Sequence, residues 1–314
     1  MNKPGGSKNY GYGRKLEYAV HNALLDKFGD GRFSTRHTYE SRIQQFLNFM
    51  RRETVRDLRR VTRDVITGYT ENLQAEIGAE SLTATTAVHR LSAVNVLMSH
   101  VRQDNALLVS PSKTIARRRH VRESAPIGLC VTDFNDLFVD LNRPYEREMT
   151  ITLALCRFAG MRFREASLTP LADTLSELLE NAACNVVHGT KGGRRVHRPV
   201  PASPALLHTL EYAVATIDRT NIIPPAFNYA RWQSFAYRNM PAYAGALNIS
   251  QGFHDLRAAY ACERYLALTG HDAPVVAGER LAPKAADREA RDMLSVELGH
   301  SRRQIASSYV GTSR

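Results

Sequence analysis

Cysteine and tryptophan are scarce in this chain, and no long apolar run occurs in it. Its 314 residues include 4 cysteines and 1 tryptophan. The cysteines form no CxxC pair, so neither a zinc ribbon nor a redox motif is supported, and we expect reduced, buried thiols. No stretch approaches the roughly 20 apolar residues that span a bilayer, and the opening residues lack the apolar core of a signal peptide. We therefore expect an intracellular protein without a membrane partner.

Metal-binding patterns are also missing from the sequence. The 11 histidines are scattered without an HExxH motif, and the carboxylates do not gather in a two-metal pattern. These absences argue against a metal-dependent nuclease. We expect a protein that uses no metal ion and no cofactor.

Acidic residues are too few to balance the basic ones. The chain holds 42 Lys and Arg against 31 Asp and Glu, a formal charge of +11. Most of this excess lies in residues 1–124, which contain 21 Lys and Arg against 12 Asp and Glu. A basic half of this kind suits a polyanionic partner, although charge alone does not separate nucleic acid from an anionic membrane surface.

The first hundred residues carry apolar residues at helical spacing. Such stripes predict amphipathic helices in four segments, 14–28, 34–53, 62–76 and 81–103, and the last two open with Ser, Thr or Asp residues that favour helix starts. We predict a compact four-helix domain over residues 1–108 and assign the apolar stripes to its core.

Arginines gather on the outer face of this domain and beyond it. A run of this kind is usually a solvated helix face, but within so basic a domain phosphate contact is at least as plausible. Residues 109–128 contain Pro111 and Pro126, which break the helical pattern and indicate a basic interdomain linker suited to a DNA backbone. The residues expected to contact DNA are Arg51, Arg52, Arg56, Arg59, Arg60, Arg117, Arg118 and Arg119.

Residues 129–314 mix helical and strand patterns and are predicted to form a second domain. The segment 184–201 has β-branched stretches on both sides of a Lys-Gly-Gly turn, which indicates a hairpin with Lys191 at its tip. A last short element is expected to start at Ser301 and to carry Tyr309. Helices are predicted over 132–141, 146–160, 203–217, 229–240 and 252–270.

Four cationic or nucleophilic side chains stand where they can converge on a phosphate. Arg162 follows the turn at 160, Lys191 is at the hairpin tip, and Arg257 lies in the first turn of a helix. A phosphodiester under attack accumulates charge on its non-bridging oxygens, which two planar guanidinium groups can stabilise, while a mobile lysine can protonate the departing oxygen. A tyrosine such as Tyr309 can attack phosphorus directly and store the bond energy as a phosphotyrosine ester.

The order of four motifs resembles that of the tyrosine recombinases, the phage integrase-type site-specific recombinases. "AGMRFREA" resembles their first arginine motif, and "GTKGGRRVHRPVP" resembles their lysine-bearing hairpin. "HDLR" resembles their His-x-x-Arg box, and "LGHSRRQIASSY" resembles their terminal His-to-Tyr segment. The resemblance implies a mainly α fold with a small β-sheet. It consists of a four-helix, SAM-like core-binding domain and an α+β catalytic domain, which together form a C-shaped clamp.

The resemblance also implies the roles of the central residues. Tyr309 would be the nucleophile that becomes joined to a DNA 3′-phosphate. Arg162 and Arg257 would hold the scissile phosphate, and Lys191 would protonate the departing 5′-oxygen.

Three further residues take supporting roles in this resemblance. His254 would assist proton transfer or bond to the phosphate, and His300 would donate to a non-bridging oxygen. Glu165 matches a carboxylate that supports the active site, with a surface ion pair as the open alternative.

The implied partner is double-stranded DNA with a specific attachment or recombination site, bound by a homo-tetramer on synapsed DNA. We expect a cytoplasmic, nucleoid-associated protein of bacterial or phage origin that integrates or excises a mobile element. A type IB topoisomerase, which shares this chemistry, and a catalytically silent DNA-binding regulator remain alternatives.

Two features depart from the usual pattern of that family. The 45 residues between His254 and His300 make a longer segment than is usual, and the surplus falls in residues 268–292. This could be a surface insertion that contacts DNA or a neighbouring protomer, or a longer helix-loop-helix. Only five residues follow Tyr309, which leaves open whether the tyrosine acts in cis or in trans.

Overall fold

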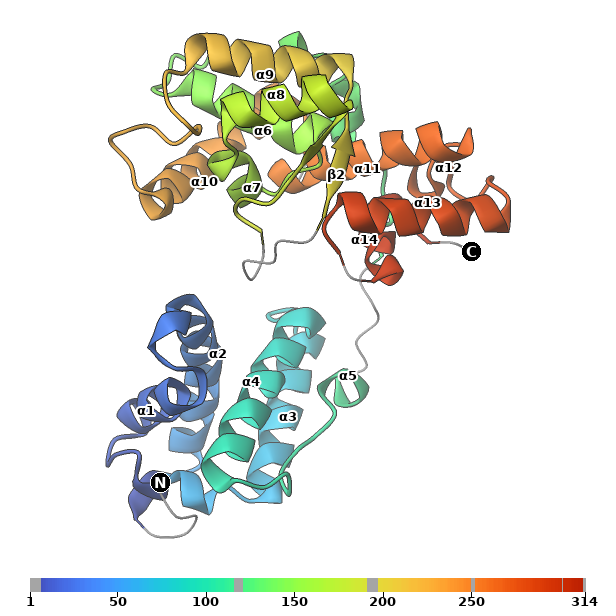
Figure 1. Ribbon diagram of the computed structural model, residues 1–314. Coiled ribbons are helices and arrows are strands. Elements are labelled where there is room, and N and C mark those ends of the chain that lie inside the picture. The colour runs from blue at the N-terminus through green and yellow to red at the C-terminus, as the bar shows by residue number, and fades with distance from the viewer. Residues whose placement is uncertain (1–6, 116–120, 191–196, 250–251, 301, 313–314) are drawn as a thin grey trace. The chain divides into compact units, whose positions relative to one another are not determined.

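The computed structural model describes residues 7–115, 121–190, 197–249, 252–300 and 302–312 (Figure 1). Within these ranges the chain is mainly helical with one two-stranded sheet, which confirms the predicted fold class. The chain divides into two compact units, Met1–Arg119 and His120–Arg314, and the division falls between residues 109 and 128. No helix in the described part of the chain is long and apolar enough to cross a membrane.

The first unit is built from amphipathic helices around a single apolar core. Thr62 and Thr83 cap the helices that follow them, because each side chain accepts a hydrogen bond from a backbone N–H of the first turn. The core is formed by the apolar stripes of all four long helices, including Phe46, Tyr69 and Leu91. The helices are α1 (Leu16–Phe28), α2 (Phe33–Arg52), α3 (Arg63–Gly78), α4 (Ala84–Arg102) and the short α5 (Pro111–Thr114).

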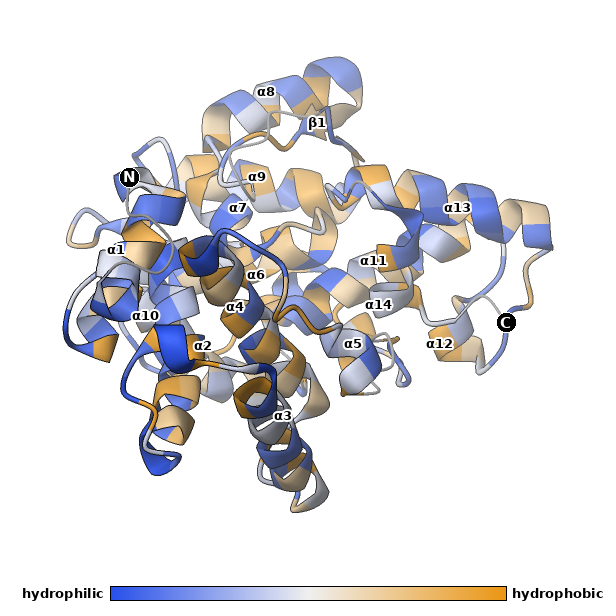
Figure 2. Ribbon diagram, turned by 90° about the horizontal axis from the view of Figure 1, so that it is seen from below, coloured by the Kyte–Doolittle hydropathy of each residue, from blue (hydrophilic) through white to orange (hydrophobic). Residues whose placement is uncertain are grey.

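The second unit packs its helices around two buried ones, α6 (Glu146–Phe158) and α11 (Phe253–Thr269). Helix α6 buries eleven of its 13 residues, and α11 buries every residue from Phe253 to Cys262 except His254, so α11 carries Arg257 into the interior. Helix α13 is amphipathic instead, with hydrophobic and hydrophilic residues alternating along it in Figure 2. The surrounding helices are α7 (Phe163–Leu168), α8 (Leu171–Asn181), α9 (Pro204–Thr216), α10 (Tyr229–Ala246), α12 (Pro274–Ala277), α13 (Lys284–Glu297) and α14 (Ser307–Val310).

The sheet joins the two ends of the predicted hairpin. Strand β1 (Ala183–Asn185) pairs antiparallel with β2 (Pro199–Pro201), and Cys184 lies opposite Val200. Proline has no N–H to donate, so the two prolines of β2 limit the ladder to a short stretch. The hairpin tip, with Lys191, lies outside the described residues.

Two expectations about the second unit were wrong. The helix predicted over residues 132–141 is only a 3-10 turn, Phe134–Leu137. Asp133 and Asp136 form a capping box that favours the start of a helix, but the backbone is already extended at Phe138, so only one turn forms. Cys130 is exposed rather than buried, whereas the other three cysteines are buried, and all four are free thiols.

The chain end is more broken than the single element expected from Ser301, which itself lies outside the described residues. A 3-10 turn, Arg303–Ile305, is followed by the four-residue helix α14. Helix α14 contains Tyr309, whose side chain is buried. Tyr309 is therefore presented by a single helical turn that depends on its neighbours for its position.

Candidate active site

The site is organised by the tight turn between α6 and α7 at Gly160. Its φ is +56°, and a Cβ atom there would lie 2.5 Å from the Tyr260 ring, so only glycine fits. The turn leaves the Gly160 carbonyl oxygen facing two buried guanidinium groups. It accepts hydrogen bonds from Arg198 Nη2 at 3.0 Å and from Arg257 Nη1. Arg162, at the start of α7, lies just beyond this turn.

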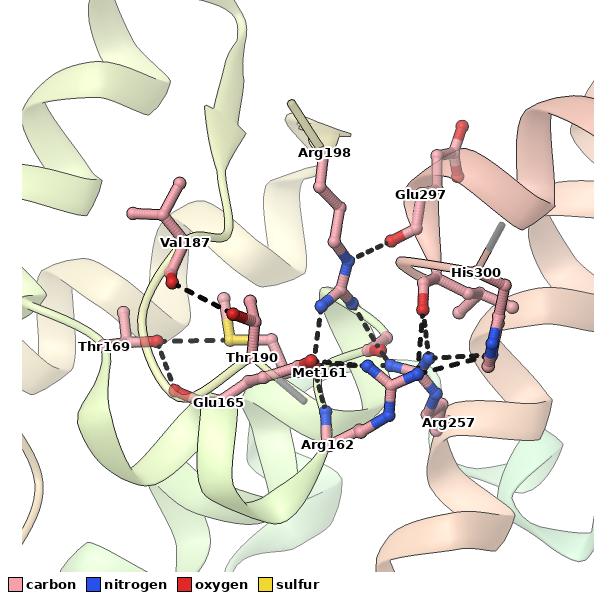
Figure 3. Close-up of polar contacts among 12 residues, drawn as sticks. Met161, Arg162, Glu165, Thr169, Val187, Thr190, Arg198, Arg257, Glu297 and His300 are labelled. Carbon is pink, nitrogen blue, oxygen red and sulfur yellow. Dashed lines mark hydrogen bonds and ion pairs between the residues drawn. The ribbon is translucent and has the colours of Figure 1, made fainter. Parts of the chain in front are cut away.

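A fully buried carboxylate gathers three arginines around itself (Figure 3). Glu165 pairs with Arg162 at 2.6 Å, with Arg198 at 2.6 Å and with Arg257 at 3.5 Å. Burial raises the pKa of Glu165, but the three arginines outweigh burial and hold it below its ordinary value, so the group is ionised. Glu165 is 0% exposed, which rules out the surface ion pair left open above.

Arg198 is a member of this cluster that the sequence did not single out. It lies just before β2 on the same inward face as Val200, and it is buried. Its Nε donates to the Glu297 carbonyl oxygen at 2.5 Å, in addition to its bonds with Glu165 and Gly160. An arginine at an inward-facing strand position was the available signal, but its partners lie far away in the sequence.

Tyr309 completes the cluster from the end of the chain. Its hydroxyl oxygen lies 3.2 Å from Arg257 Nε and 3.1 Å from His300 Nε2. The Arg257 guanidinium also lies 5.4 Å from the centre of the tyrosine ring. His300 Nε2 is within 3.4 Å of Arg257 Nη2 and 3.5 Å of Arg162 Nη2. Arg162, Arg257, His300 and Tyr309 are thus brought together from three distant parts of the sequence.

The charges around His300 determine which way its hydrogen bonds run. Burial, together with Arg257 and Arg162, lowers the pKa of His300 to about 3, so the imidazole is neutral at pH 7. Guanidinium nitrogens are donors only, so Nε2, which faces two of them, is the unprotonated acceptor nitrogen. The Tyr309 hydroxyl therefore donates its hydrogen bond to Nε2. Burial also lowers the pKa of Arg257 to about 10, which leaves it charged at pH 7.

Two other predicted site residues are placed differently. His254 is exposed in the first turn of α11, and its ring centre lies 5.3 Å from that of Tyr309. Lys191 lies outside the described residues. Its relation to the cluster remains a prediction from the sequence.

The arginines predicted to contact DNA fall into three groups. Arg51, Arg52 and Arg59 bond to polar side chains of the first unit. Arg56 and Arg60 are exposed and form no ion pair with the residues that the structure describes. Arg117, Arg118 and Arg119 lie outside the described residues.

The cluster has the electrostatics of an anion site. Three guanidinium groups face one carboxylate, which leaves two positive charges uncompensated beside a hydroxyl and a neutral imidazole. The Arg162 side chain is 28% exposed, so an incoming anion can reach it. Among the described residues, no group of three or more His, Cys, Asp or Glu side chains could hold a metal ion.

The chain is similar to known integrases in sequence and in fold. Residues 118–263 match a family described as Integrase. The fold is similar to a lambda integrase(75-356) dimer bound to a COC′ core site, with 16% identity, a TM-score of 0.57, and coverage of 93% of this chain and 92% of that one. It is also similar to a lambda integrase tetramer bound to a Holliday junction, with 14% identity, a TM-score of 0.57, and coverage of 93% and 76%. No curated protein matches this chain.

The chain therefore has a mainly helical fold, with a small sheet, that is similar to that of lambda integrase. The matched family and the two similar structures agree with the tyrosine recombinase resemblance of the sequence motifs.

Proposed function

We propose that this protein is a site-specific DNA recombinase that cuts and rejoins strands through a bond between DNA and Tyr309. One observation carries the proposal. The Tyr309 hydroxyl lies 3.1 Å from a neutral imidazole and 3.2 Å from a buried guanidinium, within a cluster that has excess positive charge. A hydroxyl with a proton acceptor on one side and an anion site on the other is suited to attack a phosphodiester.

Arg162 and Arg257 would hold the phosphate before attack. A phosphodiester carries one negative charge, and a second develops on the non-bridging oxygens as the tyrosine oxygen adds. The two uncompensated positive charges of the cluster match this increase, so they stabilise the transition state more than the bound substrate. Glu165 pairs with Arg162 and Arg257, and Arg198 pairs with Glu165, so Glu165 and Arg198 would position the two phosphate-binding arginines.

His300 would act as the general base once the phosphate is bound, because an anion beside Arg162 and Arg257 offsets the positive charges that help to lower the pKa of His300. Its Nε2 accepts the Tyr309 proton as the tyrosine oxygen bonds to phosphorus and the bond to the 5′-oxygen breaks. Lys191 would protonate the departing 5′-oxygen, as the resemblance implies, and His254 would bond to the phosphate from the exposed side. This differs from the sequence expectation for His300, because a nitrogen that faces two guanidinium donors accepts rather than donates.

Rejoining would reverse these steps with another strand. A 5′-hydroxyl gives its proton to Lys191 and attacks the phosphotyrosine, the phosphorus–tyrosine bond breaks, and the imidazolium returns its proton to Tyr309. The number of phosphoester bonds does not change, so no nucleotide triphosphate is consumed. This balance suits an enzyme that integrates or excises a mobile element.

The partner would be duplex DNA with a specific recombination site, bound by a homo-tetramer when two sites are synapsed. The basic first unit supports DNA as the partner, through backbone contacts that carry no sequence information. The two similar lambda integrase structures, one bound to a core site and one to a Holliday junction, support the same assembly here.

The experiment is covalent trapping on nicked duplexes made from the DNA that flanks the gene. A nick beside the scissile phosphate lets the short 5′-hydroxyl strand diffuse away, so the protein–DNA adduct survives SDS. We expect the wild type and the control Tyr237→Phe to form this adduct and Tyr309→Phe to form none. Tyr237 is an exposed tyrosine of α10, so its variant controls for loss of a tyrosine as such.

Each alternative function predicts a different outcome in this assay. Adducts on any sequence, with relaxation of any supercoiled plasmid, would indicate a type IB topoisomerase. DNA binding without an adduct from the wild type would indicate a silent regulator. An adduct that persists in Tyr309→Phe would refute the assignment of the nucleophile.

A further inference from the structure

The short chain segment around Tyr309 is held from behind by one buried arginine. Arg291 of α13 donates from Nη1 to Ser307 Oγ at 3.3 Å and to the Gly311 carbonyl oxygen at 3.0 Å. Its Nη2 donates to the Thr312 carbonyl oxygen at 3.1 Å. These contacts lie on both sides of Tyr309, two residues before it and two and three residues after it. A single guanidinium group therefore spans the turn that presents the tyrosine.

Arg291 is itself fixed by buried groups. Its Nε donates to Asp287 Oδ1 at 2.8 Å, one turn earlier on α13, and the same oxygen accepts the Tyr265 hydroxyl at 2.8 Å. The side chains of Arg291 and Asp287 are 4% and 5% exposed. A planar guanidinium held in this way has little rotamer freedom left, so its other donors are already aimed at the tail.

The tail also packs against α12. Gly311 has φ +83°, and a Cβ atom at that position would lie 2.8 Å from the Val275 backbone nitrogen and 2.9 Å from Val275 Cβ. The tail thus fits against α12 only because residue 311 lacks a side chain. In Figure 1, α12, α13 and α14 lie together at one end of the second unit.

Both holding elements come from the long segment between His254 and His300. Residues 268–292 contain α12 and the part of α13 that bears Asp287 and Arg291. The sequence left open whether this segment contacts DNA, a neighbouring protomer or neither. Its described contacts with Ser307, Gly311 and Thr312 point inward, to the nucleophile of its own chain.

We propose that Arg291 is a positioning residue for Tyr309, and that residues 268–292 form a cradle which holds the nucleophile in the active site of its own chain. The inference rests on the proposed function. Helix α14 is four residues long, too short to keep its own geometry in water. The alignment of the hydroxyl with Arg257 and His300 therefore depends on contacts made by the chain on either side of it.

Loss of the cradle should slow the chemical step without weakening DNA binding. Misplacing a reacting group by about 1 Å costs about 10²-fold in rate. We expect Arg291→Met to lower the single-turnover rate of adduct formation at saturating DNA by about that factor, with the DNA dissociation constant near the wild-type value. The control is Arg288→Met, which removes an exposed arginine from the same helix and should change neither quantity.

A conservative variant and a direct measure of the tail add to this test. Arg291→Lys keeps a positive charge beside Asp287, but one ammonium cannot reach Asp287 and the three tail acceptors together. Its rate should fall between those of the wild type and Arg291→Met. Amide hydrogen exchange over residues 307–312 should be faster in Arg291→Met than in Arg288→Met, while exchange in α6 stays unchanged.

A second pair of variants covers the case in which Arg291→Met does not fold. Gly311→Ala forces a methyl group against Val275 and displaces the tail, without removing a buried charge. Gly278→Ala is its matched control, because Gly278 also has a positive φ, +86°, but nothing lies within 4 Å of its Cβ position. We expect slower adduct formation from Gly311→Ala and a rate near wild type from Gly278→Ala.

The outcomes separate this inference from the proposed function. All rates are measured on a duplex on which the wild type forms the adduct, so the lack of any wild-type adduct refutes the function itself. A wild-type rate in folded Arg291→Met, or equal rates in Gly311→Ala and Gly278→Ala, overturns the cradle alone. Weaker DNA binding with an unchanged saturated rate also overturns it, because the segment would then contact DNA.

Discussion

Replacing Glu165 with glutamine removes the one carboxylate that lies among Arg162, Arg198 and Arg257. Glutamine has nearly the same size as glutamate, so the substitution removes charge while it keeps the packing. Three guanidinium groups would then face one another around a fully buried amide. We expect the whole second unit to lose stability, because these groups connect α7, α11 and the residue that precedes β2.

The size of the loss follows from the burial of the pair. Removing one partner of a buried ion pair costs about 3–5 kcal/mol in the free energy of unfolding. For a unit of this length each kcal/mol lowers the melting temperature by about 2–4 °C, so we expect a fall of roughly 6–20 °C. The lowered pKa of Glu165 also indicates that its ionised carboxylate stabilises the folded protein. Its carboxylate adds stability above the unfolded pKa, and that contribution is lost as the pH falls through the folded pKa.

Thermal unfolding with and without inorganic phosphate measures this effect. Inorganic phosphate raises the melting temperature of a protein whose folded state binds it. It should therefore raise the melting temperature of Glu165→Gln more than that of the wild type, because the variant lacks the carboxylate that neutralises part of the cluster. Glu180→Gln is the control, because Glu180 is exposed on α8. A melting temperature for Glu165→Gln within about 2 °C of the wild type, or an equal gain from phosphate in both proteins, would refute the reasoning.

Three further predictions concern other parts of the chain. The pKa of His300 is lowered to about 3 in the folded protein, so below pH 6.5 this histidine is protonated in the unfolded protein before it is protonated in the folded one. The wild type should therefore lose melting temperature more steeply than His300→Asn between pH 6.5 and pH 3, and parallel curves would contradict this. Gly160→Ala should lower both the melting temperature and the adduct rate, and a wild-type rate would show that the tight turn is not needed. The double substitution Arg56→Gln with Arg60→Gln should reduce the slope of log K for DNA binding against log salt concentration by about 2. Arg59→Gln should reduce this slope less, because Arg59 is paired with Asp57. Equal reductions would contradict the division of these arginines into exposed and paired ones.

Much of the local structure could be predicted because it depends on neighbouring residues. The four long helices of the first unit follow from apolar spacing and from Thr caps such as Thr62 and Thr83. The same reasoning failed at residues 132–141, where a capping box at Asp133 starts a single turn and the backbone becomes extended at Phe138. Cap residues and apolar spacing indicate where a helix can begin and which face it buries, and they do not fix where the chain leaves the helical conformation.

Parts of the candidate site could also be located in advance. Arg162 and Arg257 lie beside a glycine turn and in the first turn of a helix, and such positions have recognisable local signals. Tyr309 and His300 share one short motif, so their proximity follows from their spacing. Arg198 lies in the predicted hairpin, but its partners are far away in the sequence and nothing local marks them, and Arg291 lies in none of the four motifs.

The sequence by itself determined the long helices, the basic first unit, and the motifs that bear Arg162, Arg257, His300 and Tyr309. Only the tertiary structure showed that Arg198 completes the buried cluster, that burial and two arginines lower the pKa of His300, and that Arg291 contacts the chain on both sides of Tyr309. The physical reason is the same in each case. Burial and the charges of distant residues set these interactions, and both exist only after the helices have packed.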